Sequence, residues 1–367
     1  MGSHRADLAP EPVRLLPGSA DYPRDAWYVA ATIDEIAEGP LHRWLLGKPV
    51  VLFRQDDGTP VALYDRCPHR GYPLSAGKVV DGAIQCGYHG LRFGADGSCV
   101  HAPSEGTVPD ALAVESYPVV ERWQWLWIWM GDQRRADPEE IPDVSDYGIG
   151  LEGWHSETSV LLEVAANYLL PFENLLDASH ITFLHEGQID AGDVATRPLK
   201  LENENGRIFA SRRIENEPQA ELTMKTFGFS GTHAHRTIMA QAMPPNLCGI
   251  RVVLEPVEES DVDQQVNQLI VAITPQDHTH CLQFTAVTQT FPFFNDTRHE
   301  DLRNLLMEDV VAMERIQALT EKIVAETGDD DLPEYGLAAD KGAYLARRMF
   351  ARMIREERGA NAERNAA

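Results

Sequence analysis

Two segments of the chain decide its fold, Cys67-Pro-His-Arg-Gly-Tyr-Pro-Leu-Ser75 and Cys86-Gly-Tyr-His89. Each pairs one cysteine with one histidine, two or three residues apart, and sixteen residues separate His69 from Cys86. The glycines and prolines in and between these pairs predict loops, and two loops can close on a single site. The sequence therefore predicts a metal site with two thiolates and two imidazoles.

Two kinds of metal site use this donor set. Zinc would bind all four ligands in a tetrahedral structural site, whereas a [2Fe-2S] cluster of the Rieske type has two cysteines on one iron and two histidines on the other. Zinc fingers usually group cysteine with cysteine and histidine with histidine, while each segment here carries one of each. The mixed pairs favour a cluster held by Cys67, His69, Cys86 and His89, with structural zinc as the alternative.

The two segments, the second continued to Phe93, resemble the cluster-binding loops of the Rieske non-haem iron oxygenases. The resemblance covers nearly the whole chain, from Tyr22-Pro-Arg-Asp-Ala-Trp-Tyr-Val29 to the last predicted helix. Within that family the chain is most similar to monooxygenases that demethylate methoxyaromatic acids, such as vanillate and dicamba demethylases. Two segments carry this likeness, Val271-Ala-Ile-Thr-Pro-Gln-Asp-His-Thr-His280 and Glu308-Asp-Val-Val-Ala-Met-Glu314.

The sequence around the cysteine-histidine pairs predicts a small all-β domain. Between Trp27 and about Met130, short β-branched and aromatic runs alternate with Gly, Pro and Asp. The tryptophans at alternate positions from Trp123 to Trp129 predict one buried face of a strand. Residues 131–153 are acidic and rich in turn formers, as expected of a linker. We therefore expect residues 1–152 to form a Rieske [2Fe-2S] domain with its N-terminal segment and linker.

Residues 153–367 are expected to form a catalytic domain for a mononuclear non-haem iron. One helix is predicted over about residues 165–185, followed by an antiparallel sheet over 207–294 and by helices over about 300–326 and 341–357. On the last helix the basic group Arg347, Arg348, Arg352 and Arg355 predicts a solvated face, with docking of an acidic electron donor as the alternative. The fold class is α+β, an all-β Rieske domain followed by a helix-on-antiparallel-sheet domain of the helix-grip or START-like type.

The segment Asn174-Leu-Leu-Asp-Ala-Ser-His-Ile-Thr-Phe-Leu-His185 concentrates polar side chains in the first of these helices. On an ideal helix Asn174, Asp177, His180 and His185 fall within one wedge of about 140° that also holds apolar residues. They should point inward, where polar groups need partners. His180 and His185 are about 140° apart, so a shared metal requires the helix to end or bulge near Phe183.

A third ligand can be found by the same geometry. In the helix predicted over 300–326, Asp309 lies in the middle of an apolar stripe formed by Leu302, Leu305, Leu306, Met313 and Ile316. A buried carboxylate needs a cation. An iron bound by two histidines and Asp309 would provide it and leave positions open for O2. The alternative is an arginine partner for Asp309.

The resemblance implies roles for these residues. In the family, the pattern Asn-x-x-Asp-x-x-His-x-x-x-x-His carries the mononuclear iron, which identifies His180 and His185 as ligands and Asp309 as the matching carboxylate. Asn174 belongs to the same pattern, and both it and Asp177 are expected to be catalytic residues. Asp177 corresponds to a carboxylate that hydrogen-bonds to a cluster histidine of the neighbouring subunit, which implies a homotrimer.

The predicted function is that of a terminal oxygenase component. It would use O2 and an electron pair to hydroxylate a small aromatic or hydrophobic substrate, with O- or N-demethylation where the attacked carbon is a methyl group. No glycine-rich dinucleotide fingerprint follows a strand, so NAD(P)H should bind a separate electron donor, a ferredoxin and/or a flavin reductase. The alternatives are an aromatic-ring cis-dihydroxylating dioxygenase, a Rieske electron carrier without oxygenase chemistry and a zinc-stabilised binding protein.

Composition excludes other classes of protein. The chain of 367 residues has 32 Lys and Arg against 57 Asp and Glu, and its net charge of -25 would repel nucleic acids and anionic membranes. No apolar run approaches the length that crosses a bilayer, and no apolar signal segment is present. The five cysteines are too few and too sparse for a disulfide framework. We therefore expect a cytoplasmic protein with no nucleic-acid or membrane partner.

Overall fold

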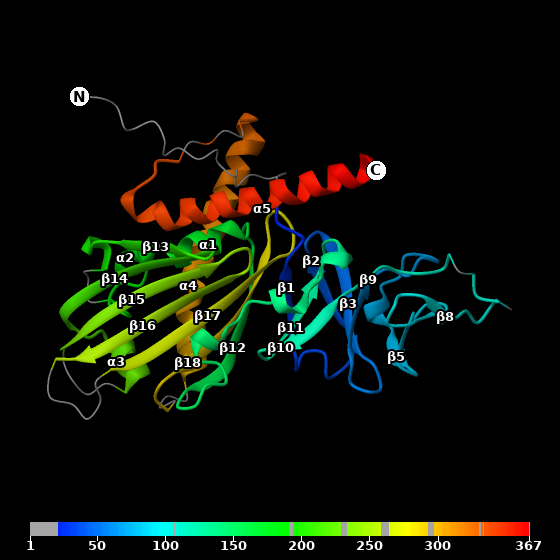
Figure 1. Cartoon of the computed structure of the whole chain (residues 1–367), viewed down its shortest axis with the longest axis horizontal. Coiled ribbons are helices and arrows are strands. Elements are labelled where there is room, and N and C mark those ends of the chain that lie inside the picture. The colour runs from blue at the N-terminus through cyan, green and yellow to red at the C-terminus, as the bar shows by residue number, and fades with distance from the viewer. Residues whose placement is uncertain are drawn as a thin grey trace. The chain divides into compact units, whose positions relative to one another are not determined.

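The computed structural model describes residues 21–366, except residues 106, 110, 191–193, 229–232, 258–263, 293–296, 330, 331 and 333 (Figure 1). These residues group into two compact units. One unit contains residues 24–143 and 274–277, and the other contains residues 21–23, 144–273 and 278–366. None of the helices among the described residues combines the length and hydrophobicity that crossing a bilayer requires.

The unit formed mainly by residues 24–143 consists of short antiparallel strands. They are β1 (Trp27–Thr32), β2 (Leu41–Leu45), β3 (Lys48–Arg54), β4 (Pro60–Tyr64), β5 (Lys78–Val80), β6 (Ala83–Gln85), β7 (Arg92–Phe93), β8 (Cys99–His101), β9 (Ser116–Tyr117), β10 (Val119–Arg122) and β11 (Trp125–Trp129). They form three sheets, ordered β1-β11-β10, β2-β3-β4-β9 and β5-β6-β7-β8. Three 3-10 turns complete the unit, η1 (Leu74–Ala76), η2 (Gln133–Arg135) and η3 (Pro138–Glu140). The all-β prediction for this part of the chain is confirmed.

The tryptophan-rich strand β11 is the centre of its sheet. All of its residues are buried, including Trp125, Trp127 and Trp129, so both faces of the strand are covered and not one alone. Trp123 lies before the strand, in a turn with Gln124 where φ is 61° and 72° at the two residues. The expectation that Trp123 belongs to the buried strand face was therefore wrong.

The other unit contains a seven-stranded sheet. Its strands are β12 (His155–Val164), β13 (Lys200–Glu204), β14 (Arg207–Pro218), β15 (His233–Met243), β16 (Leu247–Pro256), β17 (Gln265–Pro275) and β18 (Cys281–Gln289), in the order β12-β18-β17-β16-β15-β14-β13. Pairing is antiparallel between β12 and β18 and along consecutive strands from β13 to β17. The predicted antiparallel sheet is confirmed, and β12 is an additional strand that the sequence reading placed in no element.

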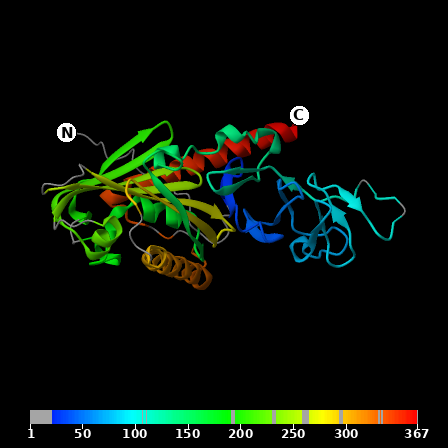
Figure 2. The same ribbon diagram turned by 90° about the horizontal axis from the view of Figure 1, so that it is seen from below.

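The helices of this unit lie around the sheet. They are α1 (Leu169–Leu176), α2 (Ile181–Leu184), α3 (Glu221–Phe227), α4 (Arg298–Thr327) and α5 (Lys341–Ala366), with 3-10 turns η4 (Ser145–Tyr147), η5 (Ala178–His180), η6 (Val194–Thr196) and η7 (Ala338–Asp340). Figure 2 shows α4, orange, along one face of the sheet. The two C-terminal helices expected from the sequence are confirmed, and the α+β class is confirmed with them.

Helix α5 packs against α1 through aromatic and charged side chains. Phe350 contacts the rings of Phe172 and Tyr168 edge-on, with centroids 5.0 and 5.3 Å away. Arg347 is buried and donates from Nη2 to Glu173 Oε2 at 2.6 Å and from Nη1 to Glu334 Oε2 at 2.7 Å. The prediction that Arg347 lies on a solvated face was therefore wrong.

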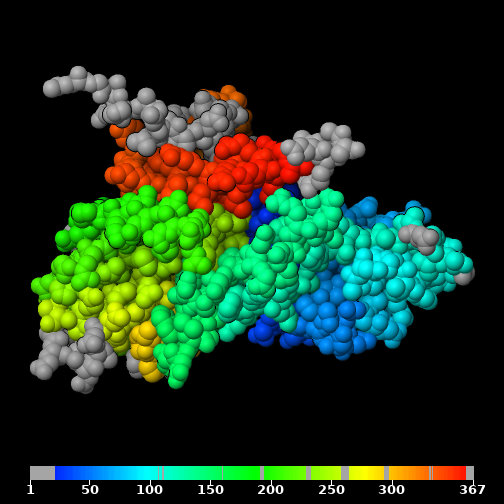
Figure 3. Space-filling model, in the orientation of Figure 1, coloured from blue at the N-terminus to red at the C-terminus, as the bar shows by residue number. Residues whose placement is uncertain are grey.

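The other basic residues of that group follow the prediction. Arg348, Arg352 and Arg355 are exposed on α5, which lies at the surface of its unit (red in Figure 3). Arg347 differs from them because its position in the helical repeat places it beside the buried residues Ala346 and Phe350.

Replacing Arg347 by methionine should lower the free energy of unfolding by about 3 kcal/mol at neutral pH, because Glu173 would remain buried without its cation. Burial raises the pKa of Glu173 above its usual value, although Arg347 lowers it. Without Arg347 the pKa should rise further, so the folded protein would bind more protons than the unfolded chain. The stability deficit should therefore shrink as the pH falls through this pKa.

Urea unfolding at several pH values measures this effect. Arg348→Met is the matched control, since Arg348 neighbours Arg347 on the exposed side of α5. Equal losses in the two variants would contradict a structural role for the Arg347–Glu173 pair.

Candidate metal centres

The two cysteine-histidine loops share one backbone geometry. The N–H of Cys67 donates to the carbonyl of Tyr72 at 2.9 Å, and the N–H of Cys86 donates to the carbonyl of Leu91 at 2.8 Å. A glycine four residues after each cysteine, Gly71 and Gly90, returns a hydrogen bond to the cysteine carbonyl. Both glycines have a φ of 76°, a left-handed conformation that residues with a Cβ rarely adopt. The two cysteine-histidine segments thus form two turns with the same pattern of backbone hydrogen bonds.

The four candidate ligands of these loops divide by burial. Cys67 and Cys86 are 2% and 1% exposed within the hydrophobic core of their unit. His69 and His89 are exposed, with ring centroids 4.5 Å apart. Burial raises the pKa of the Cys67 thiol and so does the nearby Cys86, while a backbone hydrogen bond from His69 lowers it. Two buried thiols side by side next to two imidazoles fit a metal centre that stabilises thiolates and is anchored from inside.

The second candidate centre is built where the helix predicted over 165–185 is broken. Pro171 stands in the first turn of α1, where proline is tolerated, and the helix begins at Leu169 and not near residue 165. The helix ends at Asp177, which has φ of -110° and ψ of 91°. Its carboxylate then accepts hydrogen bonds from the N–H and Oγ of Ser179, at 2.9 and 2.7 Å, and caps η5.

The interruption brings the two histidines together. His180 ends η5, and His185 follows α2 as its C-terminal cap, so an irregularity near Phe183 is confirmed, but the larger break lies at Asp177. The two rings lie 5.4 Å apart between centroids. A single straight helix was therefore the wrong prediction, and the wedge deduced from it applies to only part of the segment.

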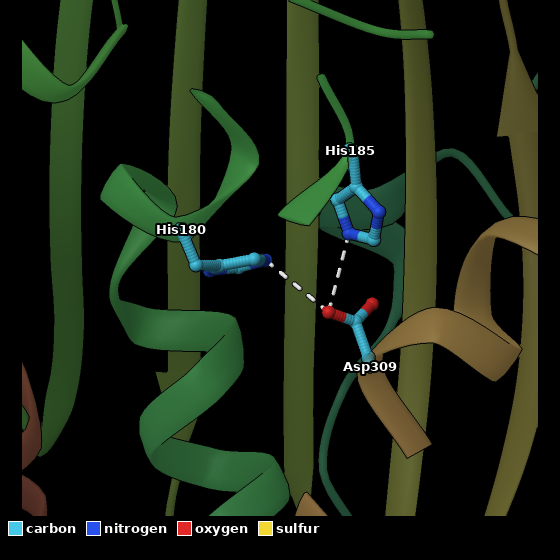
Figure 4. Close-up of side chains that lie close together, drawn as sticks. All are labelled: His180, His185 and Asp309. Carbon is cyan, nitrogen blue, oxygen red and sulfur yellow. Dashed lines mark hydrogen bonds and ion pairs between the residues drawn. The ribbon is translucent and has the colours of Figure 1, made fainter. Parts of the chain in front are cut away.

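Asp309 of α4 completes this group. His180 Nε2 lies 3.4 Å and His185 Nε2 lies 3.2 Å from Asp309 Oδ1, and the ligand atoms of the three residues lie within 4.8 Å of one another (Figure 4). Asn174 of α1 donates from Nδ2 to the same oxygen at 3.1 Å. The structure thus brings together Asn174, His180, His185 and Asp309, as the sequence predicted.

Each histidine has its other ring nitrogen fixed by a separate acceptor. His180 Nδ1 lies 2.5 Å from the carbonyl of Asp177, and His185 Nδ1 lies 2.7 Å from Glu308 Oε2. An acceptor at Nδ1 requires the N–H there, which leaves the Nε2 lone pair directed toward Asp309. Two lone pairs and a buried carboxylate at one point make a donor set that suits a divalent metal such as iron.

The carboxylates also affect the protonation of His185. Burial opposes the charged imidazole, yet hydrogen bonds with Asp309 and Glu308 together raise the pKa of His185 above its usual value. The two carboxylates thus favour a positive charge at this point of the site.

Glu308 is the residue of this site that the sequence reading missed. It is one residue from Asp309 and lies off the centre of the apolar stripe, so it resembled a solvated glutamate. In the structure Gln188 Nε2 donates to its Oε1 at 2.7 Å while its Oε2 faces His185. The stripe itself also differs from the prediction, because Ile316 is 52% exposed and Gln317 is buried.

Replacing Glu308 by leucine should weaken Fe(II) binding by about 10- to 100-fold, because carboxylate partners fix the orientation and raise the basicity of histidine ligands. Glu308→Gln keeps an oxygen acceptor for His185 Nδ1–H and should recover much of the affinity. The measurement is iron retained after dialysis against a graded chelator. Equal iron retention in the leucine variant and the unaltered protein would contradict this role.

Asp177 lies apart from the three candidate ligands. Its carboxylate is 24% exposed and, besides Ser179, lies 3.7 Å from Arg212 Nη2. The main-chain carbonyl of Asp177 contacts His180, but its side chain does not join the set around Asp309.

A cavity of about 210 Å³ adjoins the group around Asp309. Its walls come from α3, α4 and one face of the sheet, where Ile238, Val252 and Asn267 are cross-strand neighbours. Apolar side chains form most of the lining, as in binding sites for small hydrophobic molecules. Five other histidines, His101, His233, His235, His278 and His280, do not line it.

Comparison with known families matches both parts of the chain. Residues 26–118 match the Rieske [2Fe-2S] domain, and residues 164–356 match the vanillate O-demethylase oxygenase C-terminal domain. The cysteine-histidine loops lie within the first match, and the group around Asp309 lies within the second.

Individual proteins that are similar to this chain have names that agree with the two family matches. The chain is 32% identical over 351 residues to a putative toluene-4-sulfonate monooxygenase system iron-sulfur subunit of Comamonas testosteroni, covering 92% of this chain and 99% of that protein. It is 36% identical over 306 residues to the oxygenase component of dicamba O-demethylase of Stenotrophomonas maltophilia, covering 80% and 88%. The structure of dicamba monooxygenase with non-heme iron and dicamba superposes with a TM-score of 0.77 at 29% identity, covering 92% and 98%.

The chain therefore belongs to the Rieske non-haem iron oxygenases. Within that class it is an enzyme of the terminal oxygenase type, with the C-terminal domain that vanillate O-demethylase oxygenases carry. The two relatives are named as parts of larger systems, one as the iron-sulfur subunit of a monooxygenase system and the other as the oxygenase component of a demethylase. Membership of this class decides for the [2Fe-2S] cluster against structural zinc, and for an oxygenase against a bare electron carrier.

Proposed function

We propose that the chain uses O2 and an electron pair from a separate NAD(P)H-linked ferredoxin or flavin reductase to hydroxylate a small aromatic or hydrophobic compound, and that it removes an O- or N-methyl group where that carbon is attacked. The observation that carries this proposal is the convergence of His180, His185 and Asp309 at the wall of an apolar cavity. The related dicamba O-demethylase supports the demethylation.

The proposal assigns the metals to separate domains. The proposed Rieske domain lies within residues 1–152, of which residues 1–20 are outside the described part of the chain and residues 24–143 belong to one compact unit; in it Cys67, His69, Cys86 and His89 hold the cluster. Residues 153–367 form the catalytic domain, in which the three convergent side chains, His180, His185 and Asp309, hold Fe(II). The solved dicamba monooxygenase with non-heme iron supports this second assignment.

The bound metals supply the redox chemistry, the cluster delivering electrons singly and the mononuclear iron offering open positions to O2. The chain supplies the environment. Asn174 restrains the Asp309 carboxylate by a hydrogen bond, and Glu308 holds the His185 ring. The apolar walls exclude water and hold the substrate C–H bond beside the ligands.

The products follow from the atom balance. One oxygen atom enters the C–H bond, and the other leaves as water with the electron pair and two protons. A hydroxylated O-methyl or N-methyl group then breaks its bond to oxygen or nitrogen, which releases formaldehyde and the free hydroxyl or amine.

We infer that Asp177 links the two metals between subunits of a homotrimer. Its carboxylate is partly exposed and is not one of the group around Asp309, which supports a role toward a second chain. A cytoplasmic location is supported by the five cysteines of the chain, which are too few and too sparse for a disulfide framework.

Metal analysis of anaerobically purified protein tests the proposal. We expect about three irons and two acid-labile sulfides per chain, with the visible spectrum of a Rieske cluster. About two irons that Fe(II) does not raise would contradict the mononuclear site, and zinc without sulfide would contradict both centres. Formaldehyde release from methoxyaromatic compounds then tests demethylation, whereas a cis-diol product would identify a dioxygenase.

A further inference from the structure

The cavity beside Asp309 contains cations, and each described one is already paired. Arg298 donates from Nη2 to Glu157 Oε2 at 2.8 Å and from Nε to Glu157 Oε1 at 2.5 Å. Arg236 is held by two carboxylates, Asp190 at 2.9 Å and Glu217 at 2.7 Å, and is 4% exposed. In these pairs the arginine side chains already bind carboxylates with the geometry that they would need to bind an anionic substrate.

The same pattern extends to Lys225, which pairs with a carboxylate of the cavity wall. Lys225 lies 2.6 Å from the carboxylate of Asp301, which lines the cavity. Leaving aside Glu308 and Asp309 at the metal site, the three cations of these pairs face four carboxylates among the described residues. Each of these three cations is thus already matched by at least one carboxylate, and an anionic substrate would have to displace a carboxylate to pair with one of them.

The cavity does contain one oriented polar anchor. Gln289 Nε2 donates to the main-chain carbonyls of Phe291 and Pro292, both at 3.1 Å. Carbonyls only accept, so the amide orientation of Gln289 is fixed with Oε1 turned away from them. Asn267 Nδ2 donates to this Oε1 at 3.0 Å, which fixes the orientation of Asn267 in turn.

Asn267 and Gln289 thus form a hydrogen-bonded pair of side-chain amides. In this pair the side-chain oxygen of Asn267, Oδ1, is the exposed end. Asn267 lines the cavity, and among the described residues none donates a hydrogen bond to its Oδ1. Its cross-strand neighbour Val252 and its face neighbour Leu269 are apolar and also line the cavity. An acceptor in apolar surroundings favours a ligand that brings a hydrogen-bond donor.

We propose that the substrate is a neutral aromatic compound with an N–H or O–H donor that binds Asn267 Oδ1, and not an aryl carboxylate or sulfonate. This inference rests on the proposed function, since it concerns the pocket of that oxygenase. It separates the chain from the relative named for toluene-4-sulfonate, which is an anion.

Three ligands with the same ring test the proposal. They are 4-methoxybenzamide, its N,N-dimethyl derivative and 4-methoxybenzoate, titrated calorimetrically into iron-loaded enzyme without O2. The amide should bind at least about tenfold more tightly than the benzoate, and several times more tightly than the dimethyl derivative, which has no donor. Tighter or equal binding of the benzoate, or no binding of the amide at millimolar concentration, would overturn the proposal.

Two variants locate the selectivity. Asn267→Leu should make the amide and its dimethyl derivative bind equally. Glu157→Gln removes the charge that neutralises Arg298 and should raise benzoate affinity by about tenfold, with the amide unchanged. An unaltered preference in Asn267→Leu would overturn the role of that residue.

The test separates this proposal from the proposed function. Binding is measured without turnover, so selective amide binding by an enzyme that oxidises none of the ligands would contradict the proposed demethylation of methoxyaromatic compounds alone. Preferential binding and oxidation of the benzoate would contradict the neutral-substrate proposal alone.

Discussion

Replacing Asp309 by alanine is expected to lower substrate oxidation by more than about a hundredfold while the cluster spectrum stays unchanged. Loss of a direct ligand should exceed the effect of losing a ligand's hydrogen-bond partner, which costs up to about a hundredfold. His180 and His185 would remain but without the carboxylate that balances the metal charge. The cluster should persist because its candidate ligands all lie in residues 67–89.

Iron and sulfide analysis measures this result directly, with about one iron fewer per chain and no loss of sulfide. Glu314→Gln is the control, since Glu314 lies on the same helix and accepts a hydrogen bond from Ala165 N at 3.0 Å, which glutamine can also accept. Full turnover in Asp309→Ala would refute its role as a ligand. Loss of sulfide as well would show that the substitution acts on folding.

Replacing Asp177 by asparagine should slow electron transfer to the mononuclear iron by about a hundredfold or more with both metals retained. Asparagine can still accept the hydrogen bond from Ser179 N and cap η5, so the local fold should persist. The substitution removes the carboxylate charge, which the proposed contact with a cluster histidine of a second subunit requires, and the second acceptor oxygen, which takes the hydrogen bond from Ser179 Oγ.

Reoxidation of the prereduced cluster by O2 in the presence of substrate measures this step. Ser179→Ala is the matched control, because it removes the hydroxyl that donates to Asp177 Oδ2 but keeps the charge. A normal reoxidation rate in Asp177→Asn would refute the link between the metals. Loss of either metal would instead identify Asp177 as a structural residue of η5.

The candidate ligands could be selected from the sequence because residue type and spacing reflect the chemistry of a metal site. Cys67 and Cys86 are recognisable without a structure, since paired cysteines and histidines on turn-forming segments have few uses. Asp309 could be found because a carboxylate in an apolar stripe is costly without a cation. In both cases a local pattern contained the physical reason for the site.

The break in the helix could not be predicted, because periodicity continues across it. Asp177 ends one helix and caps the next, and the apolar spacing of Leu176 and Ile181 fits a single helix as well as two. An aspartate followed two residues later by serine is a capping signal, and it was present at this position. It was outweighed by the length of the apolar pattern.

Partners supplied by distant segments were also beyond prediction. Glu308 and Arg347 look solvated in a helical projection, and only the folded chain places His185 beside one and Glu173 beside the other. The phase of α4 differs by one residue near its middle, where Gln317 is buried in place of Ile316. A shift of one residue in the buried face of a helix decides such contacts. The amino-acid composition of the helix does not reveal this shift.

Helix α1 connects two segments that are far apart in the sequence. Glu173 is held by Arg347 of α5, and the next residue, Asn174, is bound to Asp309 of α4. Side chains of α1 thus connect the C-terminal helix to the candidate ligand Asp309 through two successive residues. A chimera that exchanges residues from 341 onward between relatives should therefore take the α1 sequence from the same parent. Otherwise we expect the carboxylate of Asp309 to be misaligned.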